Sequence, residues 1–219
     1  MEIKRTELPG RAAVSKKDQT RERLIPGEPG VVIVKTKSGD NSTELCRRMF
    51  KEFDIPLESY PKDMDKGEHQ KTVYDYKKRK NMPGHQAQHI IPIEWANHPV
   101  IQKIGMDMNH PQNGIPLPEP GDTVHALSTH KGYHKIYNDV VKEQLDDIDK
   151  RLGSEASVDE VEKEVYNLQC KLRKALQNGT PMYQKKEGSN GYKDPSKKKE
   201  IWDRGGGATI ELWRKILNS

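Results

Sequence analysis

The strongest hydrophobic pattern along the chain lies in its second half, where two long amphipathic segments follow each other. The first begins behind Ser128 or Thr129 as N-cap, carries apolar residues every three or four positions, and ends at Gly153. The second begins with a capping box at residues 157–160 and ends at Asn178. Because only a few residues separate the two predicted helices, we expect them to pair antiparallel.

Shorter patterns predict smaller elements before this helix pair. The β-branched residues 31–34 predict a strand, and residues 45–53 carry apolar side chains at helical spacing. Further along, residues 90–91 and residues 115–117 are candidate strands. A short helix that stops at Gly105 is expected between them. The N-terminal half is therefore predicted to contain short strands and short helices.

The length fits one large domain or a compact domain with an appendage, and the composition predicts a thin core. The chain has 219 residues, of which 32% are hydrophobic and 32% are charged, so we expect long polar loops or tails. No stretch approaches the ~20 apolar residues of a membrane helix, and the first five residues lack the apolar run of a signal peptide. Cys46 and Cys170 lie far apart in the sequence. These features argue against a membrane protein, a disulfide scaffold and a cysteine-based metal site.

The eight histidines are the main chemical signal, since all of them fall within residues 69–134. Histidine is a common metal ligand and a base that works near neutral pH, so this clustering indicates a site. His130 and His134, four residues apart at a predicted helix start, would project from one face and could share one cation. His89 precedes Ile-Ile-Pro, which fits a strand that exposes the His89 imidazole and ends at the proline. Asn113 precedes a glycine, which fits a turn into the next strand.

Each of these features also has a simpler explanation. The histidine pair could face solvent, His89 could be packed in the core, and Asn113 could serve only a turn. Other residues of this window are expected to be ordinary loop, core or surface residues: His98, His110, His125 and Glu94. The order of the three motifs is more specific than any one of them.

That order is a strand with a histidine, a strand opening with an asparagine, and a helix with His-x-x-x-His, and it resembles the ββα-metal fold of HNH endonucleases. More closely, the chain resembles the AHH nuclease family of the HNH/endonuclease VII superfamily. The shared features are a His-rich strand ending in Ile-Ile-Pro, an Asn-Gly-Ile-x-Leu-Pro stretch and a His-x-x-Tyr-His-x-x-Tyr-Asn helix start. They are found here at residues 88–92, 113–118 and 130–138. The resemblance covers residues 84–150 and extends to residues 178–183.

The resemblance implies an α+β fold, in which a ββα-metal, HNH-like nuclease core carries additional helices, including the long antiparallel pair. It places the nuclease domain over residues 66–183. The flanking parts are predicted from pattern alone. We expect a flexible arm over residues 1–30, a small strand–helix unit over residues 31–65, and a Lys-rich loop with a short C-terminal helix over residues 184–219.

The resemblance also implies roles for individual residues. His89 matches the family's general base, which takes a proton from the attacking water. Asn113 matches the asparagine whose side-chain hydrogen bonds hold the hairpin loop and the base in place. His130 and His134 match ligands of one catalytic divalent cation. Gln88 stands where the family has the first of two adjacent histidines, a metal ligand, and its hard, uncharged oxygen favours Mg²⁺ or Mn²⁺ over Zn²⁺ or Ni²⁺.

Two alternatives to ligation by Gln88 stay open: His85 could serve as the ligand instead, or the site could be inactive. A basic run precedes the motif closely and could either contact DNA phosphates or form a solvated face: Lys77, Lys78, Arg79 and Lys80.

The function implied by the resemblance is a metal-dependent, largely sequence-nonspecific DNA endonuclease with an HNH-type, one-metal mechanism. AHH domains are typical of bacterial polymorphic toxins, so we expect double-stranded DNA as substrate, a cognate acidic immunity protein as partner and no membrane partner. The protein is then expected in the bacterial cytoplasm of the producer, from which a secretion system delivers it into the target cell. The alternatives are a metal-stabilised ββα module that binds nucleic acid without cutting it, and a phage or defence HNH nuclease that is not a toxin.

Overall fold

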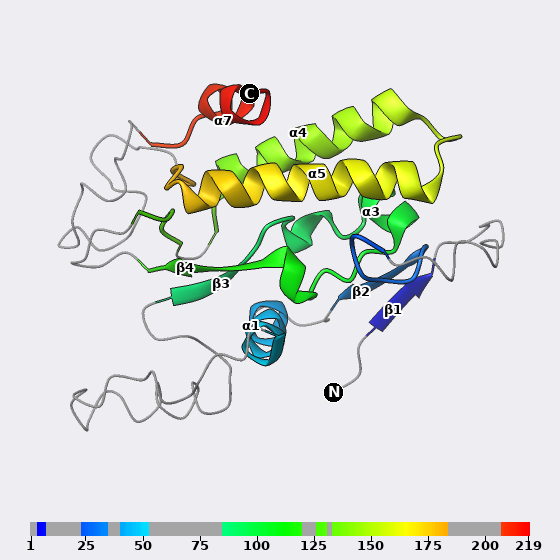
Figure 1. The fold of residues 1–219 in the computed structure, drawn as a ribbon, viewed down its shortest axis with the longest axis horizontal. Helices are drawn as coiled ribbons and strands as arrows, with labels where there is room; N and C mark the ends of the chain where they lie inside the picture. The colour runs from blue at the N-terminus through cyan, green and yellow to red at the C-terminus, as the bar shows by residue number, and fades with distance from the viewer. Residues whose placement is uncertain are drawn as a thin grey trace.

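A two-stranded hairpin lies at the centre of the fold, between helices on either side (Figure 1). The computed structural model describes residues 4–7, 23–34, 40–52, 85–119, 126–130, 133–183 and 207–219. Strand β3 (His85–His89) pairs antiparallel with β4 (Gly114–Pro118). Helix α1 (Asp40–Glu52) packs against one face of this hairpin. Helices α4 (Lys135–Leu152) and α5 (Val158–Gln177) lie on the other side.

The hairpin register determines where the side chains of β3 point. His89 pairs with Gly114 and Gln88 pairs with Ile115, so these two neighbouring residues of β3 belong to opposite faces of the sheet. Gly114 has an extended backbone with φ −111°, so no turn requires a glycine there. A Cβ at that position would instead lie 2.5 Å from Met49 Sδ. Helix α1 therefore packs directly on the backbone of β4.

The first strand of the hairpin lies earlier than the sequence predicted. We expected a strand at residues 90–91, but β3 ends at His89, and Ile90 and Ile91 follow it as fully buried residues. The backbone N–H of Ile91 donates to Asn113 Oδ1 at 2.8 Å. The Asn113 side chain thus satisfies a backbone group that would otherwise bond to a neighbouring strand, and the strand pairing ends at His89.

The long antiparallel helix pair is confirmed, and α5 has both of its predicted ends. Ser157 Oγ accepts a hydrogen bond from the Glu160 backbone N–H at 3.2 Å, and the Glu160 carboxylate accepts one from the Ser157 N–H at 2.8 Å. The helix ends at Asn178, and Gly179 follows with φ 75°. Together with the hairpin, α4 gives the order β3–β4–α4, which confirms the α+β class with an HNH-like core.

The start of α4 differs from the prediction. The helix begins at Lys135 with His134 as its N-cap, and not directly after Ser128 or Thr129. The Ser128 N–H donates to a carbonyl in the last turn of α5 at 2.8 Å, and the His130 N–H donates to the end of β4 at 2.9 Å. Because these backbone groups are bonded to other elements, the segment that contains them cannot join the helix.

Part of the predicted flexible arm is ordered against the rest of the protein. Strand β1 (Lys4–Glu7) pairs antiparallel with β2 (Val31–Val34), the strand that the sequence predicted. Ile25 is 1% exposed, and its backbone N–H donates to the carboxylate of Glu162 on α5 at 2.9 Å. Its burial in the core and this bond tie residues of the N-terminal segment to the helix pair.

Two further helices lie where the pattern predicted them. Helix α3 (Pro99–Ile104) ends at Gly105, which has φ 62°, and α7 (Ile210–Leu217) is close to the C-terminus. Single 3₁₀ turns, η2 (Ile93–Trp95) and η3 (Pro111–Asn113), lie between α3 and the two strands. Among the described residues, none of the helices has the length and apolar character that a membrane crossing requires.

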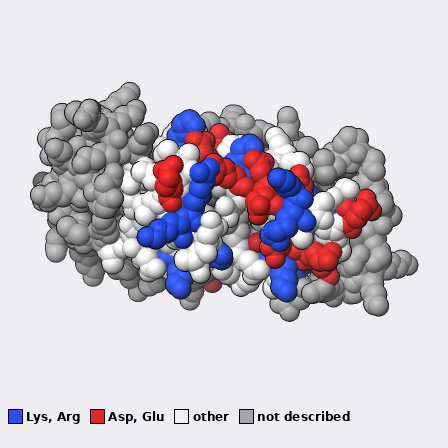
Figure 2. Space-filling model, turned by 90° about the horizontal axis from the view of Figure 1, so that it is seen from above, with Lys and Arg blue, Asp and Glu red and all other residues white. Residues whose placement is uncertain are grey.

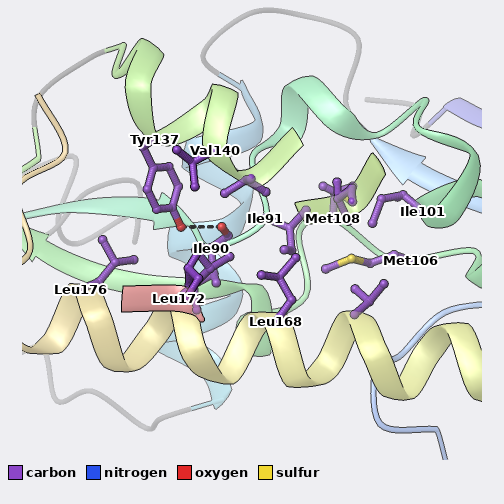
Figure 3. Close-up of a cluster of buried hydrophobic side chains, with 14 of the residues drawn as sticks. Ile90, Ile91, Ile101, Met106, Met108, Tyr137, Val140, Leu168, Leu172 and Leu176 are labelled. Carbon is purple, nitrogen blue, oxygen red and sulfur yellow. Dashed lines mark hydrogen bonds between the residues drawn. The ribbon is translucent and has the colours of Figure 1, made fainter. Parts of the chain in front are cut away.

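The buried apolar side chains form two separate clusters. The larger one, the main core, joins Ile90 and Ile91 to the inner faces of α3, α4 and α5 (Figure 3). It also includes Trp213 and Leu217 of α7. In it, the Tyr137 hydroxyl donates to the Ile90 carbonyl at 2.6 Å, and its ring packs edge-on against Trp213 at 5.1 Å between centroids. The smaller one, the α1 cluster, consists of Leu45, Cys46, Met49, Phe50 and Ala87. The two faces of the hairpin are therefore covered by independent sets of residues.

Candidate active site

A cavity of about 430 Å³ opens beside β3 and brings together four of the five predicted catalytic and metal-binding residues. These four line it: Gln88, His89, His130 and His134. The first turn of α1, the turn η2, and Tyr133 and Asn138 supply much of the remaining lining. Segments that are far apart in the sequence therefore meet at one site.

His89 is the last residue of β3, and its side chain is buried at 6% exposure. Its Nε2 lies 3.1 Å from Asn109 Oδ1. Burial lowers the pKa of the His89 imidazole to about 4, and the hydrogen bond to Asn109 opposes this shift. The imidazole is consequently neutral at pH 7, which is the form that can accept a proton.

Gln88 approaches the cavity from the opposite face of the same strand. Its Nε2 donates to the His89 backbone carbonyl at 2.7 Å, which fixes the orientation of the amide. Its Oε1 lies 2.9 Å from His134 Nε2. The side-chain oxygen of Gln88 is thus directed at an imidazole and not at solvent.

His130 and His134 are adjacent, but not for the reason that the sequence indicated. We expected both at the start of a helix on one face, whereas His134 is the N-cap of α4 and His130 lies in the segment before it. Their ring centroids are 5.2 Å apart, and the residues are 8% and 6% exposed. Burial lowers the pKa of His134 to about 4, so its imidazole is in the neutral form that binds cations.

Gln88, His130 and His134 are the residues of this cavity that could hold a divalent cation. His134 Nε2 and Gln88 Oε1 lie 2.9 Å apart, close enough for both atoms to contact one ion. Within the described part of the chain, no three His, Cys, Asp or Glu side chains form a metal-binding group, and Gln88 adds an amide oxygen to the two imidazoles. All three donors are uncharged.

Asn113 lies behind the cavity and ties the hairpin loop together. Its Oδ1 accepts from the Ile91 N–H at 2.8 Å and from Gln169 Nε2 at 3.0 Å. Its Nδ2 donates to the carbonyls of Ile91 and Met108, both at 3.0 Å. Asn113 is 1% exposed and makes all of these hydrogen bonds, so it fixes the path of the backbone that follows His89.

Among the other residues that the sequence singled out and the structure describes, Glu94 lines the cavity and the histidines do not. His85, at the far end of β3, does not line it, and His98 and His110 accept backbone N–H groups as N-caps of α3 and η3. Glu94 is exposed but does line the cavity, where it accepts from Asn138 Nδ2 at 2.6 Å. Five residues lie outside the described residues: His125, Lys77, Lys78, Arg79 and Lys80.

Sequence reasoning missed the asparagines that surround the histidines. Asn138 ends the predicted helix motif, which was a signal that we did not use. Asn109 and Asn41 carry no comparable signal, because only the path of the backbone brings them close to His89.

Comparison with known proteins agrees with this geometry. Residues 70–172 match the model of the AHH family, a nuclease family of the HNH/ENDO VII superfamily with conserved AHH. The match includes the hairpin, both histidines near α4, and most of α5, and it leaves out α1 and α7. No curated protein and no solved structure matches the chain significantly. This central segment, which contains the whole histidine-lined cavity except its α1 wall, matches the AHH nuclease family.

Proposed function

We propose that the protein is a divalent-metal-dependent endonuclease that cleaves DNA with little sequence preference. The observation that carries this proposal is a single cavity in which the neutral imidazole of His89 lies beside the donor set of Gln88, His130 and His134. Phosphodiester hydrolysis needs a base for the attacking water and stabilisation of the negative charge on phosphate and leaving oxygen. The match to a nuclease family supports the same reaction.

His89 supplies the base in this proposal. Its low pKa, caused by burial, keeps the lone pair of one ring nitrogen available at neutral pH. Its place at the end of a strand, fixed by the Asn113 network, gives the imidazole a defined position beside the donor set. General-base catalysis of this kind contributes typically ~10²–10⁴-fold to the rate.

Gln88, His130 and His134 would hold the cation, which supplies Lewis-acid stabilisation of the phosphate and the leaving oxygen. The three donors are uncharged, so they do not neutralise a divalent ion, and Glu94 is the carboxylate that lines the same cavity. A bound phosphodiester would provide the missing negative charge, so we expect tighter cation binding in the presence of DNA. The amide oxygen favours Mg²⁺ or Mn²⁺ over Zn²⁺ or Ni²⁺.

Double-stranded DNA is the proposed substrate. On the face that Figure 2 shows, basic and acidic side chains are interspersed, so this face is not uniformly basic. The net charge of +5 still favours contact with a phosphate backbone, and we assign phosphate contacts to the basic run of residues 77–80. Contacts to phosphates carry no sequence information, which supports cleavage with little sequence preference.

We also propose that the nuclease acts as an antibacterial toxin, because AHH domains are typical of such proteins. In this role it stays in the cytoplasm of the producer until a secretion system delivers it, and an acidic immunity protein inhibits it there by binding near the active site or the basic run. Expression in a host without that inhibitor should stop growth and fragment DNA, and the His89→Ala variant should be tolerated. Harmless expression of soluble, cleavage-competent wild type would contradict the toxin role.

Plasmid cleavage by the full chain tests the nuclease proposal. We expect nicking and linearisation with Mg²⁺ or Mn²⁺, none with EDTA, and weak activity with Zn²⁺ alone. His89→Ala should lose cleavage by ~10²–10⁴-fold. His85→Ala is the matched control, since it removes a histidine from the same strand at a position that does not line the cavity.

Two results would contradict the nuclease proposal. DNA binding without cleavage in any metal would favour a metal-stabilised binding module instead. Equal loss of cleavage in His85→Ala and His89→Ala, with both variants folded, would show that His89 is not the base. An RNA substrate cleaved faster than DNA would correct the substrate class alone.

A further inference from the structure

A chain of hydrogen bonds runs from helix α1 to His89 behind the cavity. His89 Nε2 lies 3.1 Å from Asn109 Oδ1. On its other side, Asn109 donates from Nδ2 to Asn41 Oδ1 at 3.4 Å and from its backbone N–H to Asp107 Oδ1 at 3.1 Å. The second carboxylate oxygen of Asp107 accepts from Arg48 Nη1. Asn41 and Arg48 both belong to α1.

This arrangement determines which nitrogen of His89 carries the proton. Because Asn109 Nδ2 is directed at the oxygen of Asn41, the Asn109 oxygen is the atom that faces His89. An amide oxygen can only accept, so Nε2 of the neutral imidazole carries the hydrogen and donates it. Nδ1 then keeps its lone pair and is the basic nitrogen.

Asn109 acts on His89 without access to a substrate. It is 1% exposed and does not line the cavity. Its backbone is fixed by Asp107, a carboxylate that is 11% exposed and ion-paired with Arg48. Because both its side chain and its backbone are hydrogen-bonded, the buried Asn109 is held in one orientation and presents its Oδ1 to His89 as the acceptor.

We propose that Asn109 is a positioning residue that fixes the tautomer and ring orientation of His89, and that α1 is part of the catalytic unit because Asn41 and Arg48 hold Asn109. This inference rests on the proposed role of His89 as the base. Helix α1 lies outside residues 70–172, so the segment that matches the nuclease family lacks two of the contacts in this network.

Nitrogen-15 NMR of the full chain in EDTA tests the tautomer directly and needs no activity. The His89 signals are identified by their loss in His89→Gln. We expect wild type to show a protonated Nε2 and an unprotonated Nδ1. Asn109→Ala should give a mixture of the two tautomers, and Asn109→Asp, which keeps an acceptor oxygen at this place, should restore the protonated Nε2.

Cleavage with Mg²⁺ then shows whether the tautomer matters for catalysis. Asn109→Ala should reduce kcat about 10- to 100-fold, as typical for residues that orient an active histidine, with little change in KM. Asn109→Asp should recover part of this loss.

The contribution of α1 is tested by a matched pair of variants. Arg48→Met removes the partner of Asp107 and should lower kcat and shift the His89 tautomer, by less than Asn109→Ala does. Arg47→Met makes the same change one position earlier, where the arginine bonds only Glu44 among the contacts that we describe, and should match wild type.

These measurements separate the inference from the proposed function. A wild type that cleaves no nucleic acid would overturn the proposed function, whereas the NMR result would still decide whether Asn109 fixes the tautomer. An unchanged tautomer or an unchanged kcat in folded Asn109→Ala would overturn the positioning role. If Asn109→Ala does not fold, Arg48→Met decides: behaviour identical to Arg47→Met in both assays overturns the inference.

Discussion

The two faces of the central hairpin are supported in very different ways. The main core is formed by four helices, includes large residues such as Trp213 and Tyr137, and surrounds Ile90 and Ile91. The α1 cluster on the other face has five buried residues and rests on a single helix. One face therefore has far more buried apolar area to stabilise it than the other.

The site uses both faces, because neighbouring residues of a strand point in opposite directions. Gln88 shares its face with Ile115 of the main core and reaches His134, whereas His89 shares its face with Gly114, which α1 covers. The well-packed side thus supports Gln88, a proposed metal donor, and the thinly packed side supports His89, the proposed base. The two halves of the proposed mechanism should then respond differently to perturbation.

The largest effect is expected from the main core. Trp213→Ala should lower the free energy of unfolding by roughly 3–5 kcal/mol, because a fully buried indole and its contact with Tyr137 are lost. Leu24→Ala, at a residue that is 43% exposed, is the control and should change it by less than about 0.5 kcal/mol. Urea denaturation measures both. A loss below about 1 kcal/mol for Trp213→Ala would mean that α7 contributes little to this core.

The pH dependence of stability compares the two faces through their histidines. His89 and His134 both have pKa values lowered to about 4, mainly by burial, against 6.5 for the unfolded chain. The stabilising effect of their neutral forms is complete above pH 6.5 and is lost as the pH falls toward 4. Between pH 6.5 and 5, each should reduce the free energy of unfolding by about 2 kcal/mol.

Denaturation of the metal-free protein in EDTA from pH 7 to 5 measures this slope. His89→Gln and His134→Gln should each remove about half of it. If only one variant reduces the pH dependence of the free energy of unfolding, the histidine replaced in the other variant is more accessible to solvent than its burial in the structure indicates.

Packing of α1 on the hairpin is tested at Gly114. Gly114→Ala places a Cβ 2.5 Å from Met49 Sδ and 2.9 Å from Leu45 Cδ1, so it should cost about 1–2 kcal/mol of stability and reduce cleavage by disturbing the base. Combining it with Met49→Ala makes room for the methyl group. The double variant should be more stable than the sum of the single effects predicts, and strict additivity would contradict this contact.

The smallest effect concerns local opening of the thinly packed face. Cys46 lies in the α1 cluster, where burial raises its pKa to about 12, whereas Cys170 is exposed. A thiol reagent at pH 8 should modify one cysteine quickly and the second only in denaturant. Rapid modification of Cys46 in the native protein would show that α1 detaches from the hairpin without global unfolding.

The sequence by itself determined the elements that depend on local signals. The two long helices were predictable because their apolar spacing, capping box and terminal glycines lie within one segment each. Motifs and a family resemblance also gave the candidate site residues, which are Gln88, His89, Asn113, His130 and His134. The cavity brings four of these five together.

Only the tertiary structure decided how these residues meet. The start of α4 moved past His130 because backbone groups near it bond to β4 and α5, which no local pattern reveals. Gly114 looked like part of a turn and is instead required by the approach of α1. The contacts of Asn109 to His89 and α1 join residues 20 and 68 positions apart, so they exist only once the chain has folded.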